Sequence, residues 1–389
     1  MEETITGIIT SLGFSSIESF MALLVVGLAV IGALIVVITF RPLMEYYPYT
    51  YPNSRVRAKI GKIFNDKQLT ELTETENEDE FKNYLRGHKD FAGLVDKYPT
   101  EQALDVNLAE SYDLLARIAP KDLKPTFDLM LDQWDIKNIK SVLIAKEAKL
   151  NEEETNELLV PYGVLKDDLS KLVEADSVQN MIVALEGTPY AKILEDALPD
   201  FNENKTLLTL ESALDNYYYE RLLAKSADQS DENTRMLHSY VGTQVDIANI
   251  KIILRAKSDN LSYDQIKPYV IKSGYELRDW KLKELMESED MTSLLSSIES
   301  SQYGKIIIDH IPEYNQTGSI TVFDDALDGY ERDMANNIFK KKPFGVGPII
   351  GFLNKKETEI KNLKIIARSK RGNSIPSSEI KEMLLWKII

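Results

Sequence analysis

The sequence predicts an all-α protein in which one transmembrane helix precedes three homologous helical domains. The first observation is a long uncharged apolar run close to the N-terminus. The second is that apolar residues recur at three- and four-residue spacing through the rest of the chain, with Glu- and Lys-rich spacers and little β-branched alternation. The third is a helical motif that returns after 111 residues and again after 113.

The composition supports folded domains and excludes several classes of protein. The chain has 389 residues, of which 43% are hydrophobic, so two or three domains with hydrophobic cores are expected. Because it contains no cysteine, it has no disulfide framework, no thiolate nucleophile and no thiolate metal site. A formal net charge of -16 argues against nucleic acid as a partner, since binding to phosphates depends on Lys and Arg.

The apolar run at residues 20–40 reads FMALLVVGLAVIGALIVVITF, which is 21 residues without a charge. At about 1.5 Å per residue such a helix spans about 31 Å, close to the ~30 Å hydrocarbon core of a bilayer. The alternative is a cleaved signal peptide, which begins with a basic segment and has a shorter apolar run. Residues 1–19 contain no Lys or Arg, so we expect a short leader followed by an uncleaved membrane anchor.

The residues that flank this span indicate its orientation. Arg41, Arg55, Arg57 and Lys59 follow it, whereas no basic residue precedes it. Basic residues close to a span are retained on the cytoplasmic side of the membrane. We therefore expect a single-pass protein of the cell membrane whose C-terminal bulk is cytoplasmic.

Residues 41–52 form the expected linker, which is rich in Tyr and Pro. Its aromatic rings suit the headgroup region of a membrane, although an ordinary linker with packed rings explains them equally well. Pro48 and Pro52 are expected to end the membrane helix, because proline has no backbone N–H to donate. The tyrosines of the linker are Tyr46, Tyr47, Tyr49 and Tyr51.

Internal repeats organise the remainder of the chain. The repeated motif reads DIKNIKSVLIAK at residues 135–146, DIANIKIILRAK at 246–257 and EIKNLKIIARSK at 359–370. A second landmark keeps the same spacing, since LEGTPY at 185–190 corresponds to IESSQY at 298–303, with a weaker echo at residues 85–87. Gly163 and Gly274, each ahead of a Leu-rich helix, are also 111 residues apart. These spacings predict helical domains at residues 53–160, 161–272 and 273–389.

Each copy of the motif carries an acid, an asparagine three residues later and a final lysine. Residues at this spacing lie on one helical face, so the acid and the asparagine can bond to a neighbouring helix or loop while the intervening aliphatic positions are buried. Such buried polar pairs specify one packing arrangement. The alternative is a metal or acid-base site, but three pairs in three domains are poorly placed to converge. The motif residues are Asp135, Asn138, Lys146, Asp246, Asn249, Lys257, Glu359, Asn362 and Lys370.

Motifs for catalysis or cofactor binding are absent from the sequence. The three histidines, His88, His238 and His310, lie far apart along the chain, and each is expected to be a surface or packing residue. There is no HExxH, no GxxxxGK followed by Ser or Thr, and no GxSxG. We therefore expect no catalytic residue, no metal site, no cofactor and no small-molecule ligand.

One dense basic run interrupts the acidic chain, formed by Lys340, Lys341 and Lys342. It suits a phospholipid surface or an acidic partner, but it is more typical of a solvated helix end.

The order of these motifs resembles one known family, the C subunit of the archaeal A-type ATP synthase, which is also called a V-type ATP synthase. This family is similar to the d subunit of vacuolar ATPases. The resemblance extends over about residues 46–389. It rests on YPNSRVRAKIGKIF from residue 51, QWDIKNIKSVLIAK from 133, FLNKKETEIKNLKIIARSKRGN from 352 and IKEMLLW from 380. Residues 1–45 depart from it, because typical members begin near SRVRAK.

The resemblance implies a funnel-like body in which three helical domains have a pseudo-threefold arrangement and no residue is catalytic. Such a protein stands on the membrane rotor ring, receives the end of the central shaft and couples the two during ATP-driven or ATP-forming ion transport. Because a collar turns with its ring, we expect the N-terminal helix to occupy the lumen of the ring. The alternative function is a membrane-tethered helical scaffold unrelated to rotary ATPases, and an enzyme with an unrecognised site is a more distant one.

Overall fold

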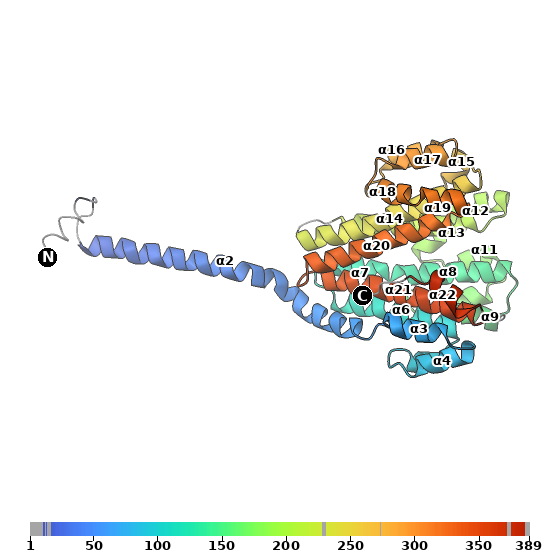
Figure 1. Cartoon of the computed structure of the whole chain (residues 1–389), viewed down its shortest axis with the longest axis horizontal. Coiled ribbons are helices and arrows are strands. Elements are labelled where there is room, and N and C mark those ends of the chain that lie inside the picture. Colours follow the sequence, from blue (N-terminus) through green and yellow to red (C-terminus); the bar gives the residue numbers. More distant parts are fainter. Residues whose placement is uncertain are drawn as a thin grey trace. The chain divides into compact units, whose positions relative to one another are not determined.

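The computed structural model describes residues 11, 13, 17–227, 231–272, 274–371 and 375–385, and this part of the chain contains helices and no strand (Figure 1). The all-α class predicted from the sequence is confirmed. The chain divides into two compact units, Met1–Thr50 and Tyr51–Ile389.

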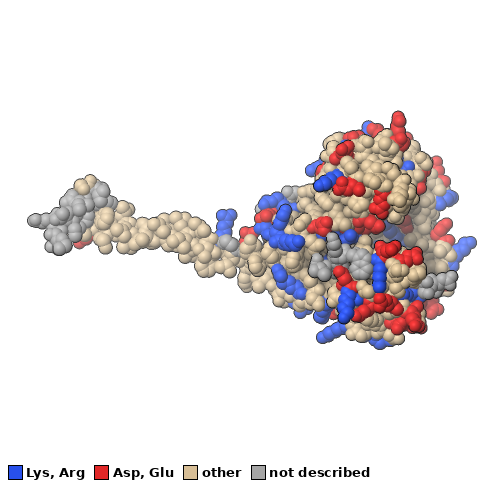
Figure 2. All heavy atoms as spheres, viewed as in Figure 1, with Lys and Arg blue, Asp and Glu red and all other residues tan. Residues whose placement is uncertain are grey.

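Helix α2 (Ile17–Ile60) contains the predicted membrane span. Side chains along residues 21–40 are almost all exposed, and Figure 2 shows no charged residue of either sign on this stretch. The helix is long and apolar enough to cross a membrane. An exposed surface of this kind calls for lipid or another apolar surface around it.

The prediction that Pro48 and Pro52 end this helix, leaving residues 41–52 as a non-helical linker, was wrong. Helix α2 runs through both prolines to Ile60. A proline removes one N–H donor and crowds the carbonyl four residues earlier, which strains a helix without necessarily ending it. Residues on both sides of the two prolines retain their own helical bonds.

The long helices of the second unit form a closed ring. Helix α6 packs against α21, α21 against α20, α20 against α14 and α14 against α13; α13 packs against α7 and α8, and α7 returns to α6. The bounds are α6 (Thr100–Ile118), α7 (Lys124–Met130), α8 (Asp132–Glu147), α13 (Leu208–Ser226), α14 (Glu232–Ser258), α20 (Thr321–Lys341) and α21 (Gly347–Ser369). This ring surrounds the candidate site described below.

Shorter helices join and flank the ring. Several begin at a side chain that caps the first turn, as Asn65, Asn77 and Asn151 do by accepting a backbone N–H three residues on. The remaining bounds are α3 (Asp66–Thr73), α4 (Glu78–Arg86), α5 (Ala92–Val95), α9 (Glu152–Glu157), α10 (Leu169–Glu174), α11 (Val178–Ala184), α12 (Pro189–Asn204), α15 (Tyr263–Ile266), α16 (Asp279–Glu287), α17 (Met291–Ile298), α18 (Gly304–Asp309), α19 (Ile311–Thr317) and α22 (Ser377–Met383).

One hydrophobic core is built from both ends of the second unit. Phe64, Leu72 and Phe81 share it with Leu363 and Ile380, together with their neighbours on α3–α6, α21 and α22. The sequence-based division placed residues 53–160 and 273–389 in separate domains. That division followed the order of the chain, whereas chain ends that lie close together can share one core. Figure 1 shows α21 and α22 beside α3 and α6.

Candidate functional site

The acid of each repeated motif binds the start of a neighbouring segment. On α8 the buried carboxylate of Asp135 accepts the N–H groups of Val164 at 3.1 Å and Leu165 at 2.8 Å, and the hydroxyl of Tyr190 at 3.1 Å. Burial raises the pKa of Asp135, although these donors oppose the shift. Gly163 has φ +97°, and a Cβ there would lie 2.2 Å from the Asp135 carboxylate, so only glycine permits this approach.

The second copy repeats this arrangement on α14. Asp246 accepts the N–H groups of Tyr275 and Glu276, each at 2.8 Å, and the hydroxyl of Tyr303 at 3.0 Å. Burial again raises the pKa of Asp246 against the effect of its donors. Tyr190 and Tyr303, which donate to the two aspartates, belong to the LEGTPY and IESSQY segments. The two landmarks of the repeat therefore contact each other in the structure.

The third acid, Glu359 on α21, uses a different set of donors. It accepts the N–H of Phe64 at 2.8 Å and pairs with Lys356 at 2.6 Å, with both charged side chains buried. Phe64 lies 295 positions earlier in the chain. The third motif therefore holds the beginning of the second unit against its end.

The asparagines make the same contact in all three copies. Asn138 exchanges two bonds of 2.8 Å with the backbone of Val160, its amide donating to the C=O and its oxygen accepting the N–H. Asn249 does the same with Ile271, at 2.9 and 2.8 Å, and Asn362 with Leu385, at 3.1 and 2.8 Å. Each asparagine side chain is fully buried and takes the place of a backbone partner, so the N–H and the C=O that it contacts both have a hydrogen bond.

The motif lysines also bond to backbone carbonyls. Lys146 donates to Val173 at 3.0 Å, Lys257 to Leu261 at 3.5 Å and Lys370 to Thr73 at 2.8 Å. Every motif residue thus has a structural contact. In the described part of the chain no group of three or more His, Asp or Glu side chains is placed to hold a metal ion.

The structure shows a second repeated contact, which the sequence motifs did not predict. Five residues after each acid stands a lysine that pairs with an aspartate on the neighbouring long helix. The pairs are Lys140 with Asp215 at 2.5 Å, Lys251 with Asp328 at 2.7 Å, and Lys364 with Asp105 at 2.6 Å. The recurring lysine was visible in the aligned copies, but its partners lie on helices whose sequences diverge.

These contacts surround a cavity of about 360 Å³ at the centre of the helix ring, which we call the axial cavity. Its wall combines aliphatic, tyrosine, lysine and carboxylate side chains from the six long helices and the end of α7. The residues are Asp105, Leu108, Tyr112, Met130, Gln133, Tyr218, Tyr219, Leu222, Gln244, Ile247, Ala248, Lys251, Glu331, Leu353, Glu357, Ile360, Lys361 and Lys364. Every helix of the ring therefore contributes to the wall of this cavity.

Two carboxylates of this wall have no ion-pair partner within the described residues. Glu357 accepts a hydrogen bond from the hydroxyl of Tyr112, and burial together with the negative charge of Glu331 raises the pKa of Glu357 to about 7. Glu331 accepts from Gln244 at 2.9 Å and from Tyr240 at 3.2 Å. The axial cavity therefore holds a carboxyl that changes charge near neutral pH.

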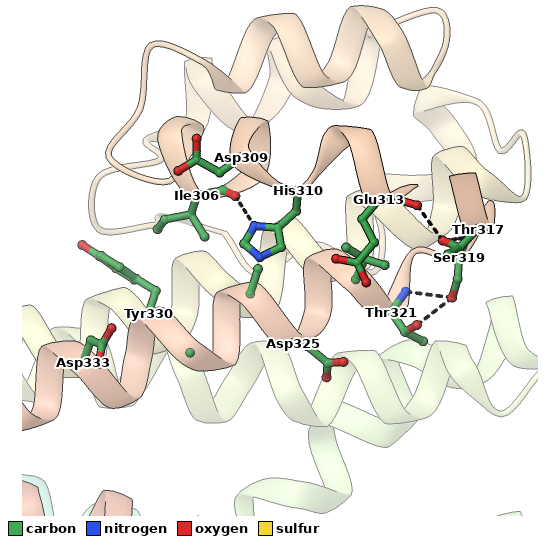
Figure 3. Close-up of a pocket in the computed structure, with 13 residues that line it drawn as sticks. Ile306, Asp309, His310, Glu313, Thr317, Ser319, Thr321, Asp325, Tyr330 and Asp333 are labelled. Atoms are coloured by element: carbon green, nitrogen blue, oxygen red, sulfur yellow. Dashed lines mark hydrogen bonds between the residues drawn. The ribbon is translucent and has the colours of Figure 1, made fainter. Parts of the chain in front are cut away.

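A larger groove of about 650 Å³ lies between α18, α19 and α20 (Figure 3). Its wall carries Asp309, Glu313, Asp325 and Asp333, and no Lys or Arg. His310 bonds through Nδ1 to the C=O of Ile306 at 2.8 Å. The carboxylates are spread along the groove, so they point to no particular chemistry.

The other residues singled out in the sequence lie apart from the axial cavity. His88 Nε2 bonds to the C=O of Lys62 at 2.8 Å, and His238 Nδ1 to the hydroxyl of Ser226 at 2.9 Å. At the end of α20, Lys340 and Lys341 are exposed, whereas Lys342 pairs with Glu232 at 2.5 Å. The tyrosines Tyr46, Tyr47, Tyr49 and Tyr51 lie within α2.

Comparison with known proteins gives a consistent result over the whole chain. The family model described as ATP synthase (C/AC39) subunit matches residues 52–383. The C subunit of the A-type ATP synthase from Methanosphaera stadtmanae is 83% identical over 385 residues, covering 99% of this chain and 100% of the relative. That of Methanobrevibacter smithii is 51% identical over 385 residues with the same coverage, and that of Methanocaldococcus jannaschii 37% identical over 351 residues, covering 88% of this chain and 87% of the relative.

Proposed function

Since the chain belongs to the C/AC39 family of ATP synthase subunits, we propose that it is the C subunit of an A-type ATP synthase, a membrane-associated complex. It is a stalk component of that rotary machine and performs no catalysis itself. The observation that carries this proposal is the likeness, over 99% of the chain, to proteins that bear the name of the C subunit of A-type ATP synthase. The alternative of an unrelated membrane-tethered scaffold is not favoured.

The protein acts as a collar between the central shaft and the membrane rotor ring. The axial cavity is the socket that receives the tip of the shaft, because every helix of the ring contributes to its wall. Lysine-aspartate pairs join the long helices two by two, and the buried acids hold the connecting segments against these helices. Close-packed interiors with such contacts transmit strain with little slack, which is what transfer of torque requires.

The collar consists of three pseudo-equivalent subdomains. Two are contiguous and centre on α8 with α13 and on α14 with α20. The third centres on α21 with α6 and draws on both ends of the second unit. The packing of α21 on α6 closes the ring of helices, and the bond between Glu359 and Phe64 holds the start of the second unit against α21.

Residues 20–40 anchor the collar as a single-pass helix with the second unit in the cytoplasm. The matches to the two relatives at 99% coverage include this span. A collar that turns with the ring cannot trail a helix through the surrounding lipid past the stator, so the helix occupies the lumen of the ring. The side chains whose chemistry best suits contact with lipid headgroups are the tyrosines of α2 and the exposed Lys340 and Lys341.

Purification from membranes tests the assignment. An affinity-tagged chain should bring down the catalytic subunits, the shaft and the rotor ring, whereas the purified chain alone should not hydrolyse ATP. Recovery without any of those subunits, or hydrolysis by the isolated chain, would contradict the proposal.

A further inference from the structure

The wall of the axial cavity contains three equivalent interfaces between subdomains. Each interface is marked by a residue three places after the aspartate of a lysine-aspartate pair and by a residue two places before the next motif acid. The pairs are Leu108 with Gln133, Tyr218 with Gln244, and Glu331 with Glu357, and all six line the cavity. Two interfaces thus offer neutral side chains, and only the third, between α20 and α21, offers two carboxylates.

The charges around these two carboxylates are not balanced within the cavity. Lys251 and Lys364 are held by Asp328 and Asp105. The remaining cavity lysine, Lys361, makes no ion pair within 4 Å in the described part of the chain; burial lowers its pKa, but the charges of Asp328, Glu331 and Glu357 outweigh that effect and raise it. Two carboxylates therefore face one uncommitted ammonium group.

We propose that Glu331 and Glu357 form an orientation key, which receives one Lys or Arg side chain from the tip of the shaft. The key sets the shaft at one of three otherwise similar angles. This inference rests on the proposed function, in which the shaft enters the axial cavity.

The physical basis is the cost of leaving a charge unpaired in a partly enclosed space. A cation placed between Glu331 and Glu357 gains charge-assisted hydrogen bonds to two carboxylates. The same cation turned to either of the other interfaces meets only glutamine with leucine or tyrosine, and keeps a desolvation penalty without compensation. Selection of one angle by making the others unfavourable is a common source of specificity.

The test uses the full chain in detergent and the purified shaft subunits of the same complex. Dissociation constants are measured for the wild type, for the double variant Glu331→Gln with Glu357→Gln, and for Glu299→Gln and Lys251→Met. Glu357→Gln introduces the residue type that stands at the equivalent position of the other two interfaces. Unfolding midpoints verify that each variant is folded. Glu299 is exposed and outside the cavity, so its variant controls for loss of a negative charge.

We expect the double variant to bind the shaft at least tenfold more weakly and Glu299→Gln to bind within twofold of the wild type. Equal binding by the folded double variant would overturn the orientation key while leaving the proposed function intact. Lys251→Met frees Asp328 and adds negative charge to the cavity, so the key predicts binding no weaker than that of the wild type. A wild-type chain that binds no shaft would overturn the proposed function and the key together.

Discussion

Single polar residues inside the second unit hold connecting segments against the long helices. Asn249 is a clear case, because its buried amide satisfies both the N–H and the C=O of Ile271. These bonds hold the end of one segment against α14, where aliphatic packing alone would leave the backbone groups unpaired.

Asn249→Ala should lower the free energy of unfolding by about 2–4 kcal/mol, because two buried backbone groups lose their partners. Chemical denaturation of the full chain in detergent measures this change. Asn337→Ala, at an exposed position of α20, is the matched control and should change stability by about 0.5 kcal/mol or less. Equal effects of the two substitutions would contradict the structural role of Asn249.

Glu357 makes stability depend on pH. Its folded-state pKa, about 7, lies above the ordinary value of 4.5. The protonated form is therefore favoured in the folded state; its stabilisation is complete below pH 4.5 and is lost as pH rises through 7.

Glu357→Gln removes this dependence. At about pH 8 the variant should be more stable than the wild type by up to about 3 kcal/mol, and the difference should disappear near about pH 4. Unfolding midpoints at several pH values measure it, with Glu299→Gln as a control that should follow the wild type. A constant difference across this range would show that Glu357 is not the titrating group.

At the scale of elements, the loops ahead of the short helices are shaped by glycine. Gly163 and Gly187 both have positive φ, +97° and +85°, but only Gly163 lies against a neighbour, the Asp135 carboxylate. Substitutions at these two glycines can therefore separate the cost of a positive φ from the cost of contact with the Asp135 carboxylate.

Gly187→Ala should lower the free energy of unfolding by about 1 kcal/mol, the cost of an alanine at positive φ. Gly163→Ala should lower it by about 2 kcal/mol more, because the added methyl group displaces a buried carboxylate from its donors. Thermal or chemical unfolding of both variants provides the comparison. If the two substitutions lower the free energy of unfolding equally, the contact between Gly163 and Asp135 contributes nothing to stability.

The buried pair of Lys356 and Glu359 on α21 tests how the two ends of the second unit are held together. Glu359→Gln leaves Lys356 without its partner and weakens the bond to Phe64, which should lower stability by about 3–5 kcal/mol. Amide hydrogen exchange should increase on α3 as well as on α21, although the two are far apart in sequence. Asp196→Asn disrupts the exposed pair with Lys192 and should have almost no effect. Faster exchange confined to α21 would contradict closure of the ring by both chain ends.

Some elements could be predicted from the sequence and others could not, for physical reasons. Helical periodicity and the repeat at Asp135, Asp246 and Glu359 suffice for the all-α class, because a buried stripe and its period are local properties. Partners such as Asp215 for Lys140 lie on helices that share little sequence, so spacing alone does not reveal them. The end of the membrane helix was wrongly predicted at Pro48 and Pro52, because the helix propensity of proline takes no account of the hydrogen bonds of neighbouring residues, which keep α2 helical.

At the scale of the whole molecule, the axial cavity is the place to which every helix of the ring contributes. Gln133, Gln244 and Glu357 stand at one position of the repeat, and the aligned copies contain this signal. Its meaning depends on the closed ring of helices, which is a property of tertiary packing. The proposal of a socket therefore depends on the fold, whereas the absence of catalytic motifs follows from the sequence.

The most direct test of the socket is site-specific crosslinking in the intact complex. The chain has no cysteine, so Ala248→Cys places one label in the wall of the axial cavity. Gln316→Cys, at an exposed position on α19, is the control. With a photoreactive reagent on each cysteine, the account predicts an adduct with the central shaft from Ala248→Cys and none from Gln316→Cys. An adduct of Ala248→Cys with stator subunits, or a shaft adduct from Gln316→Cys alone, would contradict it.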